Sequence, residues 1–290
     1  MSCRLCGNNK YIKLHSYDTK DIIKIYQDIF SLDVTAYFKE DILDLYQCAE
    51  CSLQYFPNGI EGKSDFYEQL SKIDWYYMKD KYEYDYAIKK IISVKPESIL
   101  EIGCGKGYFL DRVKDSFFVR ATEQNLEAIE ELKAKGIMLD DNQTKYDFIV
   151  SFQVLEHVKD IGDFIAWLRD KLNPGGHLLL TIPNPDSVYM KEFFQITDFP
   201  PHHINRIPKE ALYSLGKLFD LQVVDYFEEP INDIHLRQIL EERQKCFLKD
   251  DCNTISQQVV QSVVTAILPF VREVLPFKGH THGVLLRNEV

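Results

Sequence analysis

Two pairs of cysteines near the start of the chain have the spacing of metal ligands. Cys3 and Cys6 form one Cys-x-x-Cys turn, and Cys48 and Cys51 form a second. Each turn can present two thiolates to a tetrahedral Zn²⁺ ion, so the two together make a four-cysteine site. A redox pair or chance cysteines are the alternatives, but a redox pair does not need the second turn. The spacing therefore predicts a structural zinc site, because four thiolates leave no open position for catalysis.

A glycine-rich turn follows an apolar stretch at residues 98–102. It reads Glu101-Ile-Gly-Cys-Gly-Lys-Gly107. Glycines permit positive φ and remove the Cβ atoms that would block a ligand from the backbone. A dehydrogenase places its third glycine one residue later and binds a pyrophosphate, which a carboxylate at Glu101 would repel. The turn therefore favours a nucleotide-like ligand without a phosphate, although a tight turn with no ligand is the alternative.

A second acid narrows the choice of ligand. Glu123 follows the predicted strand 117–122 and can accept hydrogen bonds from two ribose hydroxyls. Glu101 can pair with an ammonium group. A ligand that has a ribose and a charged amine but no phosphate fits both acids, and S-adenosylmethionine is such a ligand.

Three histidines are candidates for acid–base chemistry, because an imidazole titrates near neutral pH. His202 and His203 follow two prolines on the loop after the predicted strand 177–182, where a parallel sheet usually places its ligand crevice. His157 follows the strand 146–152. Capping of the next helix or a hydrogen bond to a carbonyl is the alternative role for these rings. Glu156 is expected to be structural.

The elements that must position these residues alternate between strand and helix, which predicts a parallel sheet covered by helices. The apolar and turn patterns place strands at 98–102, 117–122, 137–140, 146–152, 177–182, 221–227 and 280–287. Helices are expected at 79–92, 108–114, 126–135, from 160 to about 172, and at 209–219, 233–249 and 254–275.

Three motifs in this order resemble class I S-adenosylmethionine-dependent methyltransferases. They are the glycine turn, Phe152-Gln-Val-Leu-Glu-His-Val158, and Leu172-Asn-Pro-Gly-Gly176 followed by Thr181-Ile-Pro-Asn184. The likeness covers about residues 98–229. It implies a doubly wound, mostly parallel, Rossmann-like sheet of seven strands whose last strand is antiparallel. The cysteine-rich start is similar to that of sugar-modifying and polysaccharide-linked members.

The resemblance also implies which residues bind the cofactor. The three glycines would contact the methionine part, Glu123 the ribose, and Asp140 or Asp141 the adenine. There is little room between Asp141 and Tyr146 for the usual third helix, which is a departure from the family. Cys104 is expected to pack within the turn, and Tyr77 or Tyr82 to cover the cofactor. The predicted cofactor residues are Glu101, Gly103, Cys104, Gly105, Gly107, Glu123, Gln124, Asp140, Phe152, Gln153 and Tyr82.

Composition restricts the partners. The chain has 290 residues, with 45 acidic and 34 basic side chains, and its formal net charge is −11. An acidic protein repels a phosphate backbone, so nucleic acid is not expected as a partner. No stretch predicts a signal peptide or a membrane span, and the cysteine usage fits a reducing cytoplasm. The apolar residues 259–275 could pack on the core or form a homodimer contact.

The sequence thus predicts a zinc lobe over 1–57, an aromatic connector over 58–97 and a methyltransferase core over 98–290, with a helical insertion at about 233–275. The expected reaction is methyl transfer from S-adenosylmethionine to oxygen or carbon of a small polar acceptor, with an activated sugar as the leading candidate. The expected base is His202, His203 or His157. Two alternatives are an NAD-dependent oxidoreductase and a non-catalytic zinc-ribbon binding protein on a methyltransferase-like scaffold.

Overall fold

A seven-stranded sheet forms the centre of the computed structural model, which describes residues 2–73, 76–248 and 278–289. The strand order is β10-β11-β8-β7-β4-β5-β6. The pairs from β8 to β6 are parallel, and β11 is antiparallel to both of its neighbours. The predicted fold class is therefore confirmed. The strands are β4 (Ser98–Ile102), β5 (Phe118–Thr122), β6 (Met138–Leu139), β7 (Tyr146–Phe152), β8 (Leu172–Pro183), β10 (Leu221–Pro230) and β11 (Lys278–Asn288).

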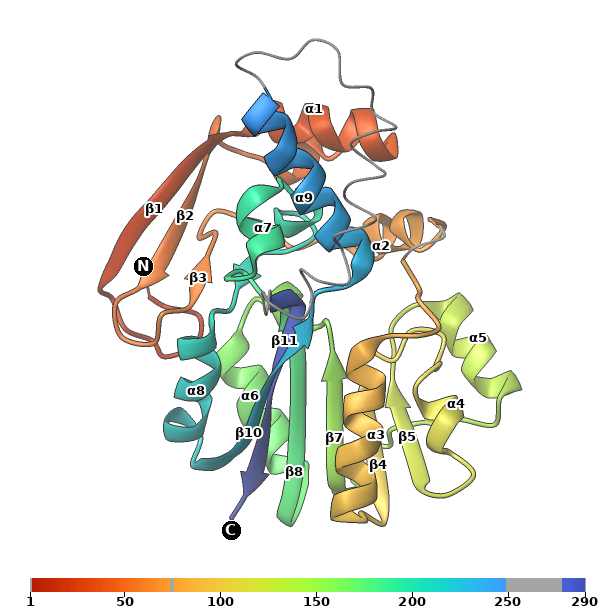
Figure 1. The fold of residues 1–290 in the computed structure, drawn as a ribbon. Coiled ribbons are helices and arrows are strands. Elements are labelled where there is room, and N and C mark those ends of the chain that lie inside the picture. The colour runs from red at the N-terminus through yellow and green to blue at the C-terminus, as the bar shows by residue number, and fades with distance from the viewer. Residues whose placement is uncertain (1, 74–75, 249–277, 290) are drawn as a thin grey trace.

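Helices cover both faces of this sheet (Figure 1). Because successive strand residues point to opposite faces, Leu178 and Leu180 pack with α6 (Ile161–Asp170) and α8 (Lys209–Leu218). Leu179 packs on the other face. That face is covered by α3 (Tyr82–Val94), α4 (Leu110–Val113) and α5 (Leu126–Ala134). The near-continuous apolar runs of the central strands follow from this two-sided burial.

A second, smaller sheet lies in the N-terminal lobe, in the order β1-β2-β3-β9. Its last strand comes from the segment after β8, so residues 1–57 alone do not supply the whole sheet. The lobe's hydrophobic core likewise includes Ile196 and Phe199 from that segment. The elements are β1 (Tyr11–Asp18), α1 (Thr19–Phe30), η1 (Thr35–Tyr37), β2 (Ile42–Cys48), β3 (Gln54–Tyr55), α2 (Ser64–Leu70), η3 (Ile196–Asp198) and β9 (Asn205–Arg206).

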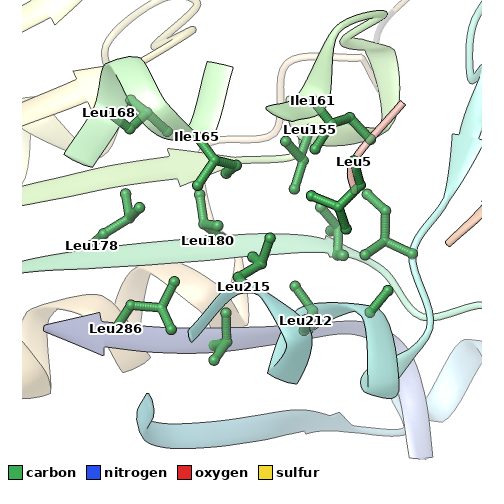
Figure 2. Packing of buried hydrophobic residues seen from close by; sticks show 14 of the residues in the cluster. Leu5, Leu155, Ile161, Ile165, Leu168, Leu178, Leu180, Leu212, Leu215 and Leu286 are labelled. Carbon is green, nitrogen blue, oxygen red and sulfur yellow. The ribbon is translucent and has the colours of Figure 1, made fainter. Parts of the chain in front are cut away.

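Leu5, between the first two cysteines, joins the lobe to the core. Its side chain belongs to the same buried cluster as Leu155 and Ile161, and Figure 2 shows the three together. The amide of Gly162 donates to the carbonyl of Arg4 (3.0 Å). The first cysteine turn is therefore packed directly on the start of α6.

The remaining elements are η2 (Leu155–His157), α7 (Val188–Glu192) and α9 (Asp233–Leu248). The helix expected at 254–275 lies outside the described residues. Within the described part of the chain, no helix combines the length and apolar character needed to cross a membrane.

Candidate active site

The glycine turn follows β4 at the end of the sheet where β5 and β7 also finish. Gly103, Gly105 and Gly107 have φ values of 63°, 52° and 69°. A Cβ on Gly103 would lie 2.8 Å from Val154 Cγ2, and one on Gly105 would lie 2.6 Å from Tyr77 Cε1. Both the backbone conformation and the close approach of neighbours therefore require glycine here.

Glu101 is a buried acid without a full set of partners. The residue is 2% exposed, and its Oε2 atom accepts no hydrogen bond from the described residues. Burial raises the pKa of this carboxyl well above its usual range, while the charge of Lys81 acts in the opposite direction. A buried acceptor of this kind is costly to leave unpaired. It therefore suits a cationic ligand group that would bind beside the turn.

Glu123 lies directly over the turn. Its Oε2 accepts a hydrogen bond from the amide of Gly105 (2.7 Å), and its Oε1 accepts from the amides of Gln124 (2.7 Å) and Asn125 (2.8 Å). A carboxylate has about four acceptor positions, so capacity remains for a ligand hydroxyl. The structure therefore brings the two predicted acids to the same turn.

The other residues expected around the cofactor lie either below the glycine turn or at the end of β7. Cys104 is buried in the hydrophobic cluster below the turn, as expected for a packing residue. Phe152 packs edge-on against Phe109 (4.9 Å between ring centroids). Gln153 has a φ of 57°, and the Nε2 atom of its side chain donates a hydrogen bond to the carboxylate of the buried Glu83 (3.0 Å). Gln153 thus belongs to a polar group at the end of β7 that includes an acid which sequence reasoning did not single out.

Asp140, which the family resemblance assigns to the adenine, is paired with two side chains of the protein. Its carboxylate forms an ion pair with Lys171 (2.6 Å) and accepts a hydrogen bond from the hydroxyl of Tyr146 (2.6 Å). Both charged side chains are less than a tenth exposed. The alternative, Asp141, accepts from the amides of Gln143 (2.9 Å) and Thr144 (2.8 Å), which lowers its pKa to about 2. Both acids thus form contacts within or beside the short connection from β6 to β7, which stands where the family usually has a third helix.

Of the two tyrosines expected to cover the cofactor, one reaches the turn. The ring of Tyr77 lies on Gly105. The ring of Tyr82 instead lies 6.2 Å from that of Phe227 on β10, and none of its described contacts joins it to the turn. α3 begins at Tyr82, and the ring of this residue packs toward β10, so a contact of Tyr82 with the cofactor stays a prediction.

The three candidate histidines form one cluster. Ring centroids lie 4.3 Å apart for His202 and His203, and 4.7 and 4.8 Å from each of these to His157. One ring nitrogen from each lies within 4.8 Å of the others. Burial lowers the pKa of His157 to about 4 and that of His202 and His203 well below the usual range. All three imidazoles are therefore neutral near pH 7.

Glu156 completes this cluster. Its Oε1 lies 3.9 Å from His203 Nε2 and 4.0 Å from His157 Nε2, and neither carboxylate oxygen accepts a hydrogen bond from the described residues. Burial raises its pKa to about 8. Sequence reasoning assigned Glu156 a structural role, and its neighbours His202 and His203, 46 and 47 residues later, could not be placed beside it from spacing alone.

An aromatic pair connects the histidine cluster to the turn. The ring of Tyr76 lies 5.1 Å from that of Tyr77, which covers Gly105, and 6.1 Å from that of His202. The cluster and the turn therefore belong to one site at the ends of β4, β5, β7 and β8.

The four predicted cysteine ligands also come together. Cys3 and Cys51 have their sulfur atoms 3.6 Å apart, as do Cys6 and Cys48. All four sulfur atoms lie within 4.8 Å of one another and none is in a disulfide. A tetrahedral ion with Zn–S bonds of about 2.3 Å needs sulfur atoms roughly 3.8 Å apart. The cluster could therefore hold a zinc ion.

A family model described as a methyltransferase domain matches residues 75–226, which include the glycine turn, both acids and the histidine cluster. This chain belongs to the class I S-adenosylmethionine-dependent methyltransferases. The resemblance inferred from the motifs is confirmed, and the family disfavours the alternative of a nicotinamide-dependent oxidoreductase.

Known relatives of this methyltransferase differ in what their names say they act on. The mitochondrial ubiquinone biosynthesis O-methyltransferase of Candida albicans is 24% identical over 201 residues, which cover 62% of this chain and 55% of that protein. The tRNA U34 carboxymethyltransferase of Pseudoalteromonas translucida is 29% identical over 115 residues, which cover 34% of this chain and 36% of that protein. The chain thus spans between about a third and just over half the length of these relatives.

Solved structures support the methyltransferase fold. A SAM-dependent methyltransferase from Archaeoglobus fulgidus has a TM-score of 0.51 and 18% identity, covering 76% of this chain and 99% of that one. A protein titled a [4+2]-cyclase has a TM-score of 0.50 and 13% identity, covering 80% of this chain and 99% of that one. A shared fold therefore does not by itself specify the reaction.

Proposed function

We propose that this methyltransferase transfers a methyl group from S-adenosylmethionine to a small polar acceptor. The observation that carries the proposal is the buried, unpaired Oε2 of Glu101 beside three glycines with positive φ. The ammonium group of the methionine part would supply the missing partner. Glu123, which already accepts from the amide of Gly105, would hold the ribose.

S-adenosylmethionine supplies an activated methyl group on a sulfonium. The C–S bond breaks as the bond from methyl carbon to acceptor forms, and the acceptor's proton must leave. The protein's part is chiefly to align the two reactants and to receive that proton. We assign the second task to the cluster of His157, His202 and His203, in which the ring of His202 lies 6.1 Å from that of Tyr76.

The acceptor that we propose is an activated or nucleotide-linked sugar. A sugar offers hydroxyl groups to the polar side chains that this end of the site contains, namely Glu83, Gln153, Glu156 and Tyr67. The relatives' names provide the competing classes: a ubiquinone precursor and a tRNA. The net charge of −11 disfavours the tRNA.

We further propose that the four cysteines hold a structural Zn²⁺, because their sulfur spacing suits a closed tetrahedral site. Free thiols at this cluster support a location in the reducing cytoplasm. A homodimer contact through residues 259–275 stays a prediction.

Calorimetry with S-adenosylhomocysteine tests cofactor binding, and turnover with labelled S-adenosylmethionine tests the acceptor. We expect micromolar or tighter binding and label transfer to sugar nucleotides, with none to a quinone precursor or to tRNA. The double variant H202A/H203A should lose turnover and keep its affinity for S-adenosylhomocysteine. If the wild-type protein binds NAD and ignores S-adenosylhomocysteine, or binds neither, the proposed function is wrong.

A further inference from the structure

The histidine cluster has a feature that acid–base chemistry does not require. Every Nδ1 atom in it faces an acceptor. His157 Nδ1 lies 2.6 Å from the carbonyl oxygen of His202, and His202 Nδ1 lies 2.9 Å from that of Thr197. His203 Nδ1 lies 3.4 Å from a carboxylate oxygen of Asp198. A carbonyl or carboxylate oxygen only accepts, so each Nδ1 carries the hydrogen and donates it.

This arrangement fixes the tautomer of all three rings. In a neutral imidazole with Nδ1 protonated, the lone pair is on Nε2. Metal-binding histidines show the same pattern, because a carbonyl or carboxylate accepts a hydrogen bond from one ring nitrogen and leaves the other to the metal. Three rings oriented in this way in one cluster are more than a single capping or packing role would need.

Glu156 lies beside the three rings as an acid whose carboxylate has no hydrogen-bond partner among the described residues. Its Oε1 lies within 4.0 Å of Nε2 in both His157 and His203, and both of its oxygens are buried without a hydrogen bond from the described residues. Ligands at about 2.0–2.1 Å from a tetrahedral ion are roughly 3.3 Å apart. The ring nitrogens of the three histidines lie within 4.8 Å of one another, so an approach of up to about 1.5 Å would give that geometry.

The backbone around the cluster is held in place. The carbonyl of Glu156 accepts from the amide of Ile204 (3.1 Å), and Asn205 donates from its side chain to the carbonyl of Val158 (2.7 Å). The two segments that carry the four side chains are thus joined on both sides of the cluster. His157 retains 19% exposure of its side chain, which provides an entry for an ion.

We propose that His157, His202 and His203 bind a divalent cation of the zinc class through Nε2. Three imidazole nitrogens suit Zn²⁺ and its first-row neighbours and leave the fourth position of a tetrahedral ion open. The site is separate from the four-cysteine cluster. A nitrogen that ligates the ion cannot also be a free base. An acceptor hydroxyl at the open fourth position would instead have its pKa lowered by the ion, and the carboxylate of Glu156, which lies beside the cluster, would receive its proton. That consequence, unlike the binding itself, rests on the proposed function.

Metal counting on the full-length protein tests the inference. Metal-depleted protein is refilled with excess Zn²⁺, passed through gel filtration and analysed for zinc. We expect two ions per chain in the wild type, one in H202A/H203A and one in the double cysteine variant C3S/C48S. H15A, which removes an exposed histidine on β1, should retain two. One ion in the wild type, or two in H202A/H203A, would overturn the proposal.

Cobalt gives a readout that needs no variant and covers the case in which H202A/H203A fails to fold. Wild-type protein refilled with Co²⁺ should show visible d–d absorption from two ions but a thiolate-to-cobalt band for only one. Absorption accounted for by the thiolate site alone would contradict the second site. Calorimetry with S-adenosylhomocysteine on the same samples separates the two proposals: two ions without cofactor binding refutes only the function, and cofactor binding with one ion refutes only the second site.

Discussion

Single residues at the glycine turn determine which ligand charge the site favours. Glu101 is enclosed and lacks a partner for Oε2, whereas Glu123 is half-buried and already accepts three backbone hydrogen bonds. The same side-chain type therefore has two roles, because burial differs between the two positions. A cation binds best against the enclosed acid, and neutral hydroxyls bind best against the half-buried one.

Glu101→Gln tests the role of the enclosed acid. The amide keeps the shape but removes the charge that would pair with the ammonium, so the affinity for S-adenosylhomocysteine should fall roughly 10- to 100-fold, from the loss of about 1.5–3 kcal/mol for a charge-assisted hydrogen bond. Calorimetry measures this change. Glu68→Gln, on the exposed face of α2, should leave affinity unchanged. Equal affinities in all three proteins would refute the pairing.

The raised pKa of Glu101 also gives the binding a pH dependence. Below its pKa the carboxyl is neutral, and above it the carboxylate attracts the ammonium, so affinity should increase as pH rises. The ligand's amino group has a pKa near about 8, so the range from about pH 5 to 7 isolates the protein's contribution. The wild type should gain affinity over that range and Glu101→Gln should not. A flat wild-type profile would contradict the raised pKa.

Asp140 gives the opposite prediction, since its role is in folding. Asp140→Asn leaves Lys171 as a buried charge without its partner, which costs about 3–5 kcal/mol. Urea unfolding should show this loss. The affinity for S-adenosylhomocysteine, measured without urea where the variant is folded, should be unchanged. Asp141→Asn, at an exposed turn, is the matched control and should cost much less. A large loss of affinity with normal stability would support the assignment of Asp140 to the adenine instead.

At the scale of elements, hydrophobic periodicity and turn residues are sufficient to predict the strands of the core. They do not predict the contacts that join the core to the N-terminal lobe. Residues 146–152 and 221–227 show clear apolar runs, and both are strands in the structure. The two-residue β9 has no periodic signal, because its strand character comes from pairing with β3. The site followed the same rule: the glycine turn is local in sequence and was found, whereas the pairing of Glu156 with His203 depends on a loop that returns from β8. The ion pair of Asp140 with Lys171 likewise joins residues 31 positions apart, so spacing alone does not predict it.

The joint between the first cysteine turn and α6 depends on Leu5. This side chain is 6% exposed and packs with Leu155 and Ile161 (Figure 2). Leu5→Ala should therefore destabilise the protein by about 2–5 kcal/mol, as large-to-small changes in a core do. Leu14→Ala, on the exposed face of β1, should cost no more than about 0.5 kcal/mol. Urea unfolding measures both, and equal small losses would show that the turn does not pack on the core in solution.

At the scale of the whole molecule, the N-terminal lobe and the core share chain segments. Arg4 donates to the carbonyls of Phe56 (2.9 Å) and Ile204 (3.3 Å). The hydroxyl of Tyr26 on α1 donates to the carbonyl of Phe199 (3.0 Å). The segment after β8 thus completes the lobe's sheet, fills its hydrophobic core and carries two of the clustered histidines. Independent folding units would have few contacts across their boundary, so we expect the molecule to unfold in one transition.

Removal of the zinc ion that we propose at the four-cysteine site tests this coupling. Without the ion, the turn that carries Leu5 and Arg4 loses its support, so the lobe and the core should be destabilised together. Hydrogen exchange in increasing urea, followed by mass spectrometry of peptides from β2 and β7, should give one midpoint for both, and zinc removal should lower both midpoints equally. His15→Ala, with its zinc retained, is the control and should match the wild type. If β2 exchanges after zinc removal while β7 stays protected, the core folds without the lobe. In that case the histidine loop, which connects the two, has a local stability of its own.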